Sequence, residues 1–201
     1  LHLCDYNLEK MEKTSMTKHD LLAEVCMAAR YEGDSIKTHY TIHQEKYRDS
    51  ASQLCTELAR SFADIGDIVR GKDLYLGYDD KEKKRREKLE NDLKDIFAKI
   101  YNEVTSGRTN GQTLQKRYKD DPEFFKLRED WWYANRQEIW KAITCHARRN
   151  DKYFRDACSG GSPTEGYCRC SDKPNAGKPK AGNGDVNIVP TYFDYVPQYL
   201  R

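Results

Sequence analysis

Residues 59–71 read ARSFADIGDIVRG and form the centre of an amphipathic pattern. Between residues 50 and 70 the large apolar side chains recur three or four positions apart, at Leu54, Leu58, Phe62, Ile65 and Val69. This spacing places them on one face of a helix. Gly71 follows and favours a helix end, because glycine readily adopts the left-handed conformation that closes many helices. The pattern therefore predicts a helix over residues 50–70.

Three other segments show the same helical periodicity. One begins near residue 17 and is expected to end at Gly33, and another runs over residues 81–106. A fourth helix is expected to begin at Asp121 and Pro122, as N-cap and first helical residue, and to continue to residue 143. Strand-like alternation is almost absent. The sequence therefore predicts an all-α bundle of long helices with long surface loops.

Length and composition agree with a folded domain. The 201 residues are 37% hydrophobic and 34% charged, yet the formal net charge is only +2. Disorder usually accompanies a high net charge, so this balance favours a folded chain. Turn residues are concentrated at 105–112 and 171–184, where we expect loops. No apolar stretch is long enough to cross a membrane, and the chain opens on neither Met nor a signal peptide, so we interpret it as a piece of a longer protein.

The sequence carries no motif that indicates an enzyme, a cofactor or a metal centre. His39 and His43 are four residues apart but have no evident third ligand. Cys145 and His146 are adjacent, and adjacent side chains on a helix point about 100° apart, so they do not form a nucleophile and its base. We predict no catalytic residue, no cofactor and no metal ligand.

Two aromatic and acidic features are better explained by folding than by binding. The tryptophans of the last helix have core spacing and do not suggest a carbohydrate platform: Trp131, Trp132 and Trp140. Asp64 and Asp67 flank Gly66, which predicts a tightly packed helix crossing with solvated acids rather than a metal site.

Two basic clusters are the binding candidates. Residues 1–80 carry 10 basic and 15 acidic side chains, whereas residues 81–201 carry 25 and 18. The first cluster opens the helix at 81–106 and comprises Lys83, Lys84, Arg85, Arg86 and Lys88. The second comprises Arg148, Arg149, Lys152 and Arg155, with positions 148, 152 and 155 expected on one helical face. Two interpretations stay open, namely solvated faces or a site for a sulfated or phosphorylated polyanion.

The chain has seven cysteines, an odd number. In an oxidising compartment an odd count leaves one thiol without a partner in the chain. Cys158, Cys168 and Cys170 are spaced by ten and two residues, which favours disulfides over a zinc site.

Three stretches together resemble a known family. Residues 59–71 resemble the central motif of Duffy-binding-like domains. Residues 130–142 (DWWYANRQEIWKA) look like a second block of that family, and residues 189–201 (VPTYFDYVPQYLR) look like a third. The particular residues of these three motifs, together with residues 25–33, are similar to the α-type domain at the head of the erythrocyte membrane protein 1 family of Plasmodium falciparum.

The resemblance implies host-cell adhesion, and no enzyme activity. Such proteins lie on the outer face of the infected erythrocyte and bind red-cell or vascular receptors. For the α type the implied partners are heparan sulfate, blood-group sugars or complement receptor in rosetting, together with host antibodies. Nucleic acid is not implied, and the membrane is implied only through the rest of the parent protein. The motif residues are interpreted as fold residues, so no binding site is carried over by position. A structural and antigenic scaffold for a neighbouring binding domain is the alternative.

The resemblance also implies a subdomain division and a disulfide scheme. Residues 1–13 would be the tail of a first subdomain and residues 14–201 most of a helical second one, truncated at its C-terminus, with the third subdomain absent. Cys4 would pair with a cysteine before Leu1 and so be unpaired here. The other six would pair as Cys26–Cys145, Cys55–Cys170 and Cys158–Cys168.

Overall fold

The structure is a computed structural model that describes residues 18–47, 52–74, 78–106, 111–155, 157–158, 161–170 and 189–201. Within these ranges the chain forms α2 (Lys18–Tyr47), α3 (Ser52–Arg70), α4 (Asp80–Thr105), α5 (Gly111–Arg117) and α6 (Phe125–Ile143), followed by the short 3₁₀ turns η1 (Phe193–Tyr195) and η2 (Gln198–Leu200). The described residues contain no strand. The prediction of an all-α, disulfide-stapled helical bundle is therefore confirmed.

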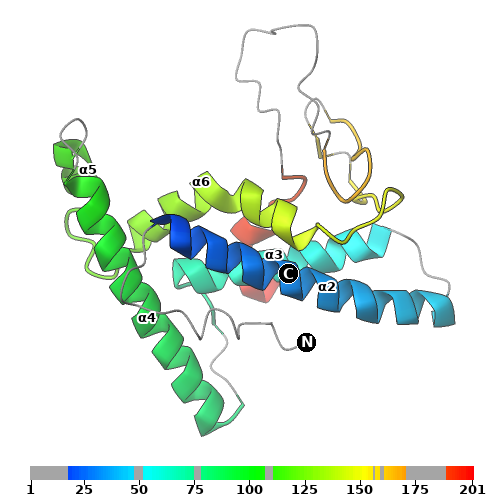
Figure 1. The fold of residues 1–201 in the computed structure, drawn as a ribbon, viewed down its shortest axis with the longest axis horizontal. Helices are drawn as coiled ribbons and strands as arrows, with labels where there is room; N and C mark the ends of the chain where they lie inside the picture. The colour runs from blue at the N-terminus through cyan, green and yellow to red at the C-terminus, as the bar shows by residue number, and fades with distance from the viewer. Residues whose placement is uncertain are drawn as a thin grey trace, which may run out of the picture.

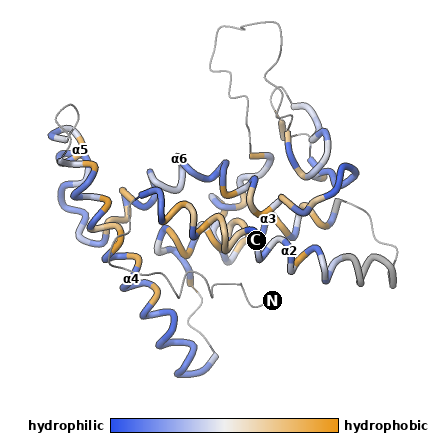
Figure 2. The backbone as a smooth tube through the Cα atoms, in the orientation of Figure 1, coloured by the Kyte–Doolittle hydropathy of each residue, from blue (hydrophilic) through white to orange (hydrophobic). Residues whose placement is uncertain are grey.

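Three long helices form the centre of the molecule. α2 and α6 run in the same direction and α3 runs opposite to both (Figure 1). Each of the three contacts the other two. α4 crosses this group and its N-terminal half projects away from it (Figure 1). Figure 2 shows that this projecting half is hydrophilic, whereas the apolar residues gather where the helices meet. No helix among the described residues is long and apolar enough to cross a membrane.

The core is aromatic at its centre. Trp132 and Phe62 are fully buried, with ring centroids 5.1 Å apart, and the ring of Trp140 is nearly perpendicular to the same phenyl ring, with centroids 5.2 Å apart. Trp131 is 7% exposed. The prediction that the three tryptophans belong to the core is confirmed, and none of them forms an exposed platform.

Gly66 lies at a close contact between α3 and α6. A Cβ atom at this position would lie 2.7 Å from the indole ring of Trp132. Only glycine lets the ring pack against the α3 backbone without a shift. The predicted tight helix crossing is confirmed.

The expected helix end at Gly33 is wrong, because α2 continues through it to Tyr47. A Cβ at Gly33 would lie 2.0 Å from the carbonyl oxygen of Ile143, at the end of α6. Glycine inside a helix costs about 1 kcal/mol relative to alanine. Here it allows two helices to touch, so tertiary packing rather than helix termination explains the residue.

The start of α6 is also later than expected. The helix begins at Phe125, and the carboxylate of Asp121 accepts hydrogen bonds from the backbone N–H groups of Phe125 and Lys126, at 3.0 and 2.7 Å. Asp121 therefore caps the helix from four residues upstream, while Phe124 adopts a left-handed φ of 57°. The Asp121 side chain does bond to the start of the helix, but the expected positions are wrong, because the N-cap is Phe124 and Pro122 lies before the first helical residue.

The other boundaries agree with the sequence, with one addition. α3 ends at Arg70, and Gly71 has a φ of +70° as a helix-closing glycine requires. α4 has Asp79 as its N-cap, with the carboxylate accepting from Glu82 N at 2.7 Å. α5 was not expected, and its first two residues fall in the segment assigned to a loop. The expected loop at 171–184 lies outside the described residues.

Candidate functional site

The stretches that carry the family resemblance meet inside the bundle. Asp194, from residues 189–201, is 1% exposed, and its carboxylate accepts hydrogen bonds from Trp132 Nε1 at 2.9 Å and Arg136 Nε at 2.8 Å. Its backbone carbonyl accepts a bond from Arg70, which belongs to residues 59–71. These polar groups are saturated by one another. They hold helices together and are not available to a ligand.

The carboxylates beside Gly66 belong to the same internal network. Asp67 is 4% exposed and pairs with Arg70 at 2.9 Å and with Arg201. Arg201 also pairs with Asp64 at 2.7 Å. Burial raises the pKa of Asp64, an effect that Arg201 opposes. The expectation of solvated acids is wrong for Asp67, which is buried, whereas the side chain of Asp64 stays 42% exposed. The chain returns to α3 more than a hundred residues later and places the Arg201 guanidinium against both carboxylates.

Two disulfides join the C-terminal part of the described chain, and their pairing differs from the expected scheme. Cys55 pairs with Cys168, and Cys158 pairs with Cys170. The expected Cys55–Cys170 and Cys158–Cys168 bridges are therefore wrong, although the same four cysteines are involved. Cys168 is fully buried beside α6, where its carbonyl accepts from Trp140 Nε1 at 3.1 Å. That bond positions residue 168, rather than 170, against the start of α3.

The expected Cys26–Cys145 bridge is absent, and both residues are free thiols. α2 and α6 run parallel, so the helical register determines which residues face each other (Figure 1). Cys26 lies near Glu138, and Asp34 faces His146, with Asp34 Oδ1 and His146 Nδ1 3.7 Å apart. Cys26 and Asp34 are eight positions apart, which is roughly 12 Å of helix and beyond the reach of a disulfide. Cys4 lies outside the described residues.

The first basic cluster is divided between two faces of α4. Lys84 and Lys88 are exposed and lie one helical turn apart, and Lys83 and Arg85 are also exposed. Arg86 instead points back toward the end of α3 and pairs with Asp73 at 2.6 Å. The helix therefore does not present its cations as a single surface.

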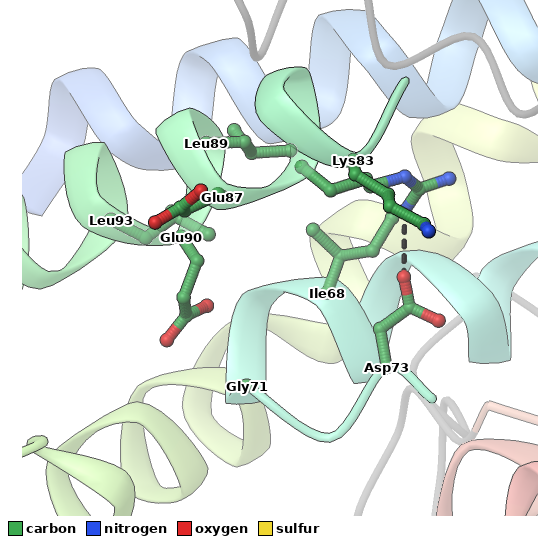
Figure 3. A pocket seen from close by; sticks show the side chains of 9 residues that line it. Ile68, Gly71, Asp73, Lys83, Glu87, Leu89, Glu90 and Leu93 are labelled. Carbon is green, nitrogen blue, oxygen red and sulfur yellow. Dashed lines mark hydrogen bonds and ion pairs between the residues drawn. The ribbon is translucent and has the colours of Figure 1, made fainter. Parts of the chain in front are cut away.

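A groove of about 590 Å³ separates the end of α3 from the N-terminal half of α4 (Figure 3). Ile68, Leu89 and Leu93 are its apolar lining. Its charged lining has both signs: Lys83, Arg86, Asp73, Glu87 and Glu90. Because carboxylates outnumber the cations there, the groove has no chemistry that would favour a polyanion.

The second basic cluster lies beyond α6 in residues 148–155, which we name the basic segment. α6 ends at Ile143, so this segment is not helical and the expected helical face is wrong. The backbone bonds show where the helix stops, because the N–H of Thr144 still bonds four residues back, to the carbonyl of Trp140, whereas that of Cys145 bonds only three back, to the carbonyl of Ala142. All four expected cations of the segment are nonetheless exposed: Arg148, Arg149, Lys152 and Arg155.

The acid of the basic segment is turned away from its cations. Asp151 is 7% exposed, and its carboxylate accepts a hydrogen bond from the backbone N–H of Arg148 at 2.5 Å. Among the described residues no ion pair is formed by any of the four cations, and Arg155 instead lies over the ring of Phe154 at 5.2 Å. The sequence pattern identified these cations. It did not reveal that the carboxylate of Asp151 bonds to the backbone and leaves their charges unneutralised.

The two basic clusters lie well apart in the molecule (Figure 1). The N-terminal end of α4 projects on one side, and the basic segment follows the far end of α6. One compact ligand does not contact both. Of the histidines considered as ligands, His39 is exposed and the side chain of His43 lies outside the described residues. Across the described ranges no three His, Cys, Asp or Glu side chains are grouped to hold a metal ion.

Comparisons with solved structures agree on one kind of domain. The NTS-DBL1-alpha and CIDR-gamma double domain of a PfEMP1 protein from Plasmodium falciparum, varO strain, is 36% identical, with a TM-score of 0.70, and the match covers 99% of this chain and 25% of that one. The ICAM-1-binding DBLbeta domain of the PfEMP1 IT4var13 is 28% identical, with a TM-score of 0.63, over 99% and 39%. A further PfEMP1 DBLb domain, bound to human ICAM-1, is 25% identical, with a TM-score of 0.60, over 99% and 36%.

The present chain thus spans between a quarter and two fifths of the length of these solved structures. No curated protein matches it. A family model described as the Duffy binding domain matches residues 1–201. This is a family of binding domains, which supports the prediction that the chain is not an enzyme. Since the match extends over every residue and the motif blocks meet in one buried network, the chain belongs to the Duffy binding domain family.

Proposed function

We propose that this chain is a host-cell adhesion module of a parasite variant surface antigen. The observation that carries the proposal is the family match over residues 1–201. Two of the similar solved domains are described as binding ICAM-1 or as bound to it, so this fold serves receptor binding elsewhere. As part of such an antigen, the chain acts on the outer face of the infected erythrocyte. Its attachment to the membrane lies in the rest of the parent protein.

The purified chain tests this proposal directly. Its binding should be measured to intact red cells, to immobilised human ICAM-1 ectodomain, and to an array of neutral and sulfated glycans. Binding to at least one of these is expected. Failure on all three, by protein with the Cys55–Cys168 and Cys158–Cys170 bridges intact, would contradict an adhesion role for these residues.

For the ligand, we propose an anionic glycan such as heparan sulfate, bound at the basic segment. Its four cations are exposed, and no carboxylate of the described chain pairs with them. Three are arginines, whose guanidinium groups can give two parallel hydrogen bonds to one sulfate or carboxylate. On α4, by contrast, Arg86 is already paired and the groove carries three carboxylates.

Charge reversal separates the two basic clusters. The variant R148E/R149E/K152E should lower heparin affinity by at least about a hundredfold, because each lost charge-assisted contact contributes about 1.5 kcal/mol or more. The control K81E/K84E/K88E makes the same change in net charge on α4 and should have a much smaller effect. Wild-type affinity should fall steeply as salt rises. Equal losses in the two variants would assign the binding to overall charge instead of the basic segment.

The scaffold alternative rests on a different observation. The family motif residues are used in internal bonds, with Asp194 and Arg70 each about 1% exposed, so the shared stretches present no shared binding surface. In that case a neighbouring domain binds the receptor, and this chain presents variable surface to host antibodies. The expected result is then that this chain binds no receptor when isolated, although the longer protein cannot bind the receptor without it.

Blood-group sugars and complement receptor are further proposed partners, and the array and red-cell assays include them.

We also infer that the described helices form the second, helical subdomain of a Duffy-binding-like domain. Residues 1–13 would then be the tail of the first. A chain of residues 14–201 should keep the helical circular dichroism and both disulfides of the full chain. Loss of either would place the boundary elsewhere.

A further inference from the structure

The basic segment carries four like charges on a stretch of chain without regular secondary structure, so other contacts must fix its conformation. A helix or strand would do this through its regular backbone bonds, but residues 148–155 belong to neither. Like charges repel, and loose side chains lose entropy when a ligand orders them. The shape of the segment must therefore come from bonds to other parts of the chain.

Those bonds come from residues 161–170, which we name the facing segment. The backbone N–H of Tyr167 donates to the carbonyl of Arg148 at 3.0 Å, and that of Cys168 donates to the carbonyl of Asp151 at 2.8 Å. The backbone N–H of Tyr153 donates to the hydroxyl of Thr164 at 2.9 Å. On the basic segment only backbone groups make these contacts, so its cationic side chains stay exposed.

The facing segment is itself anchored. Cys168 is bonded to Cys55 on α3, and Cys170 to Cys158. Gly166 packs so closely that a Cβ there would lie 2.3 Å from the carbonyl oxygen of Arg149. The Cys55–Cys168 disulfide thus connects the facing segment, and through it the basic segment, to the helical bundle.

Asp151 is the centre of this arrangement. Its carboxylate accepts from Arg148 N at 2.5 Å, its N–H donates to the carbonyl of Arg148 at 3.0 Å, and its carbonyl accepts from Cys168. A carboxylate among four cations is expected to pair with one of them and weaken the site. Because it bonds to the backbone instead, the residue closes a turn while the guanidinium groups stay outside.

We propose that Asp151, supported by Thr164, is a positioning residue that pre-organises the basic segment for an anionic glycan. This inference rests on the anionic-glycan site proposed above and adds what makes the site competent. The carboxylate acts through its hydrogen bond to the backbone, and its charge acts against binding.

The two possible roles of Asp151 predict opposite changes in heparin affinity when the residue is replaced. If the residue were only a charge, removing it would strengthen heparin binding, because the cluster would become more positive. If it positions the segment, D151A should bind heparin about tenfold more weakly, since several charged side chains are then ordered only on binding. D151N removes the same charge but keeps an oxygen acceptor for Arg148 N, so it should bind as tightly as wild type or more tightly.

The controls use the same segment. Glu165 is an exposed carboxylate in the facing segment, so E165A repeats the charge change without losing a turn. We expect wild-type or tighter heparin binding from it. T164V changes no charge and removes the acceptor for Tyr153 N, so it should bind roughly threefold more weakly. T164V also serves if D151A fails to fold, which unreduced peptide mapping and circular dichroism would show.

The measurement is heparin affinity of the chain over a range of salt, with amide hydrogen exchange at residues 148–168. D151A should lose protection at Tyr167 and Cys168, whereas D151N should keep it. Equal affinity of D151A and D151N, or unchanged binding by T164V, overturns the positioning role and leaves the glycan site standing. If R148E/R149E/K152E binds heparin as well as wild type does, the glycan site fails, and the positioning role fails with it.

Discussion

The helical bundle and the basic segment use charged residues in opposite ways. In the core of the bundle two arginines, Arg70 and Arg128, are buried and fully hydrogen-bonded: Arg128 donates to the carbonyl of Val69 at 2.6 Å and to Glu90 at 2.6 Å. In the basic segment the arginines are exposed, and the backbone makes the bonds. Charge in the bundle holds the fold together, whereas charge in the segment is presented to the solvent. Whether an arginine of this sequence stabilises the fold or is available for binding can therefore be judged only once its partners are known.

The largest expected effect breaks the connection between the two regions. Removing the Cys55–Cys168 bridge as C55A/C168A should lower the free energy of unfolding by about 5 kcal/mol in the chain-entropy model, because the closed loop is long, at 113 residues of sequence separation. C158A/C170A opens a loop of only 12 and should cost about 3 kcal/mol. Denaturant unfolding measures both. A larger loss from the short bridge would show that the connection to α3 is not what stabilises the segment.

The next effect tests whether the buried charges of the bundle are structural. D194A removes the carboxylate that accepts from Arg136 and from Trp132 Nε1, and breaking a buried pair in this way costs about 3–5 kcal/mol. E138A removes an exposed pair with Lys141 and should change stability by about 0.5 kcal/mol or less. Urea unfolding of the two variants gives the comparison. Similar values for both would mean that burial of the network contributes little.

The third prediction concerns G33A, for which helix propensity and the structure predict opposite changes in stability. If Gly33 only weakened α2, G33A would stabilise the protein by about 1 kcal/mol. Because the added Cβ would lie 2.0 Å from the carbonyl of Ile143, we expect G33A to destabilise it by about 1–3 kcal/mol. S35A, at an exposed position of the same helix, is the control and should stay within about 0.5 kcal/mol. A rise in melting temperature for G33A would contradict the close contact.

The smallest effect leaves stability unchanged and compares two thiols. Cys26 is partly buried in the bundle, and burial, with a contribution from Glu138, raises the pKa of its thiol to about 11. Cys145 is exposed where α6 leads toward the basic segment. Only thiolates are alkylated, so iodoacetamide at pH 8 should label Cys145 well before Cys26. Labelling of Cys26 should rise about tenfold per pH unit until the pH nears its pKa. Mass spectrometry of peptides measures both rates, and equal rates at pH 8 would contradict the burial.

Local pattern predicted most of the bundle. The spacing of Leu54, Phe62 and Val69 indicated α3 to within two residues, and Gly71 marked its end. The core tryptophans followed from the same periodicity. These features depend on side chains three or four positions apart, which lie on one face of any α-helix whatever surrounds it. The candidate cations were also found in this way, since their clustering is visible in the chain.

What the chain sequence settled about this protein is most of its long helices, their apolar faces and the family to which its motifs belong. The tertiary structure decided which cysteines meet, why Gly33 lies within a helix, and which cations are left without a carboxylate. The physical reason is distance along the chain. Cys55 and Cys168 are 113 positions apart, and Arg201 reaches Asp64 across 137, so these contacts exist only after the helices have packed in one register.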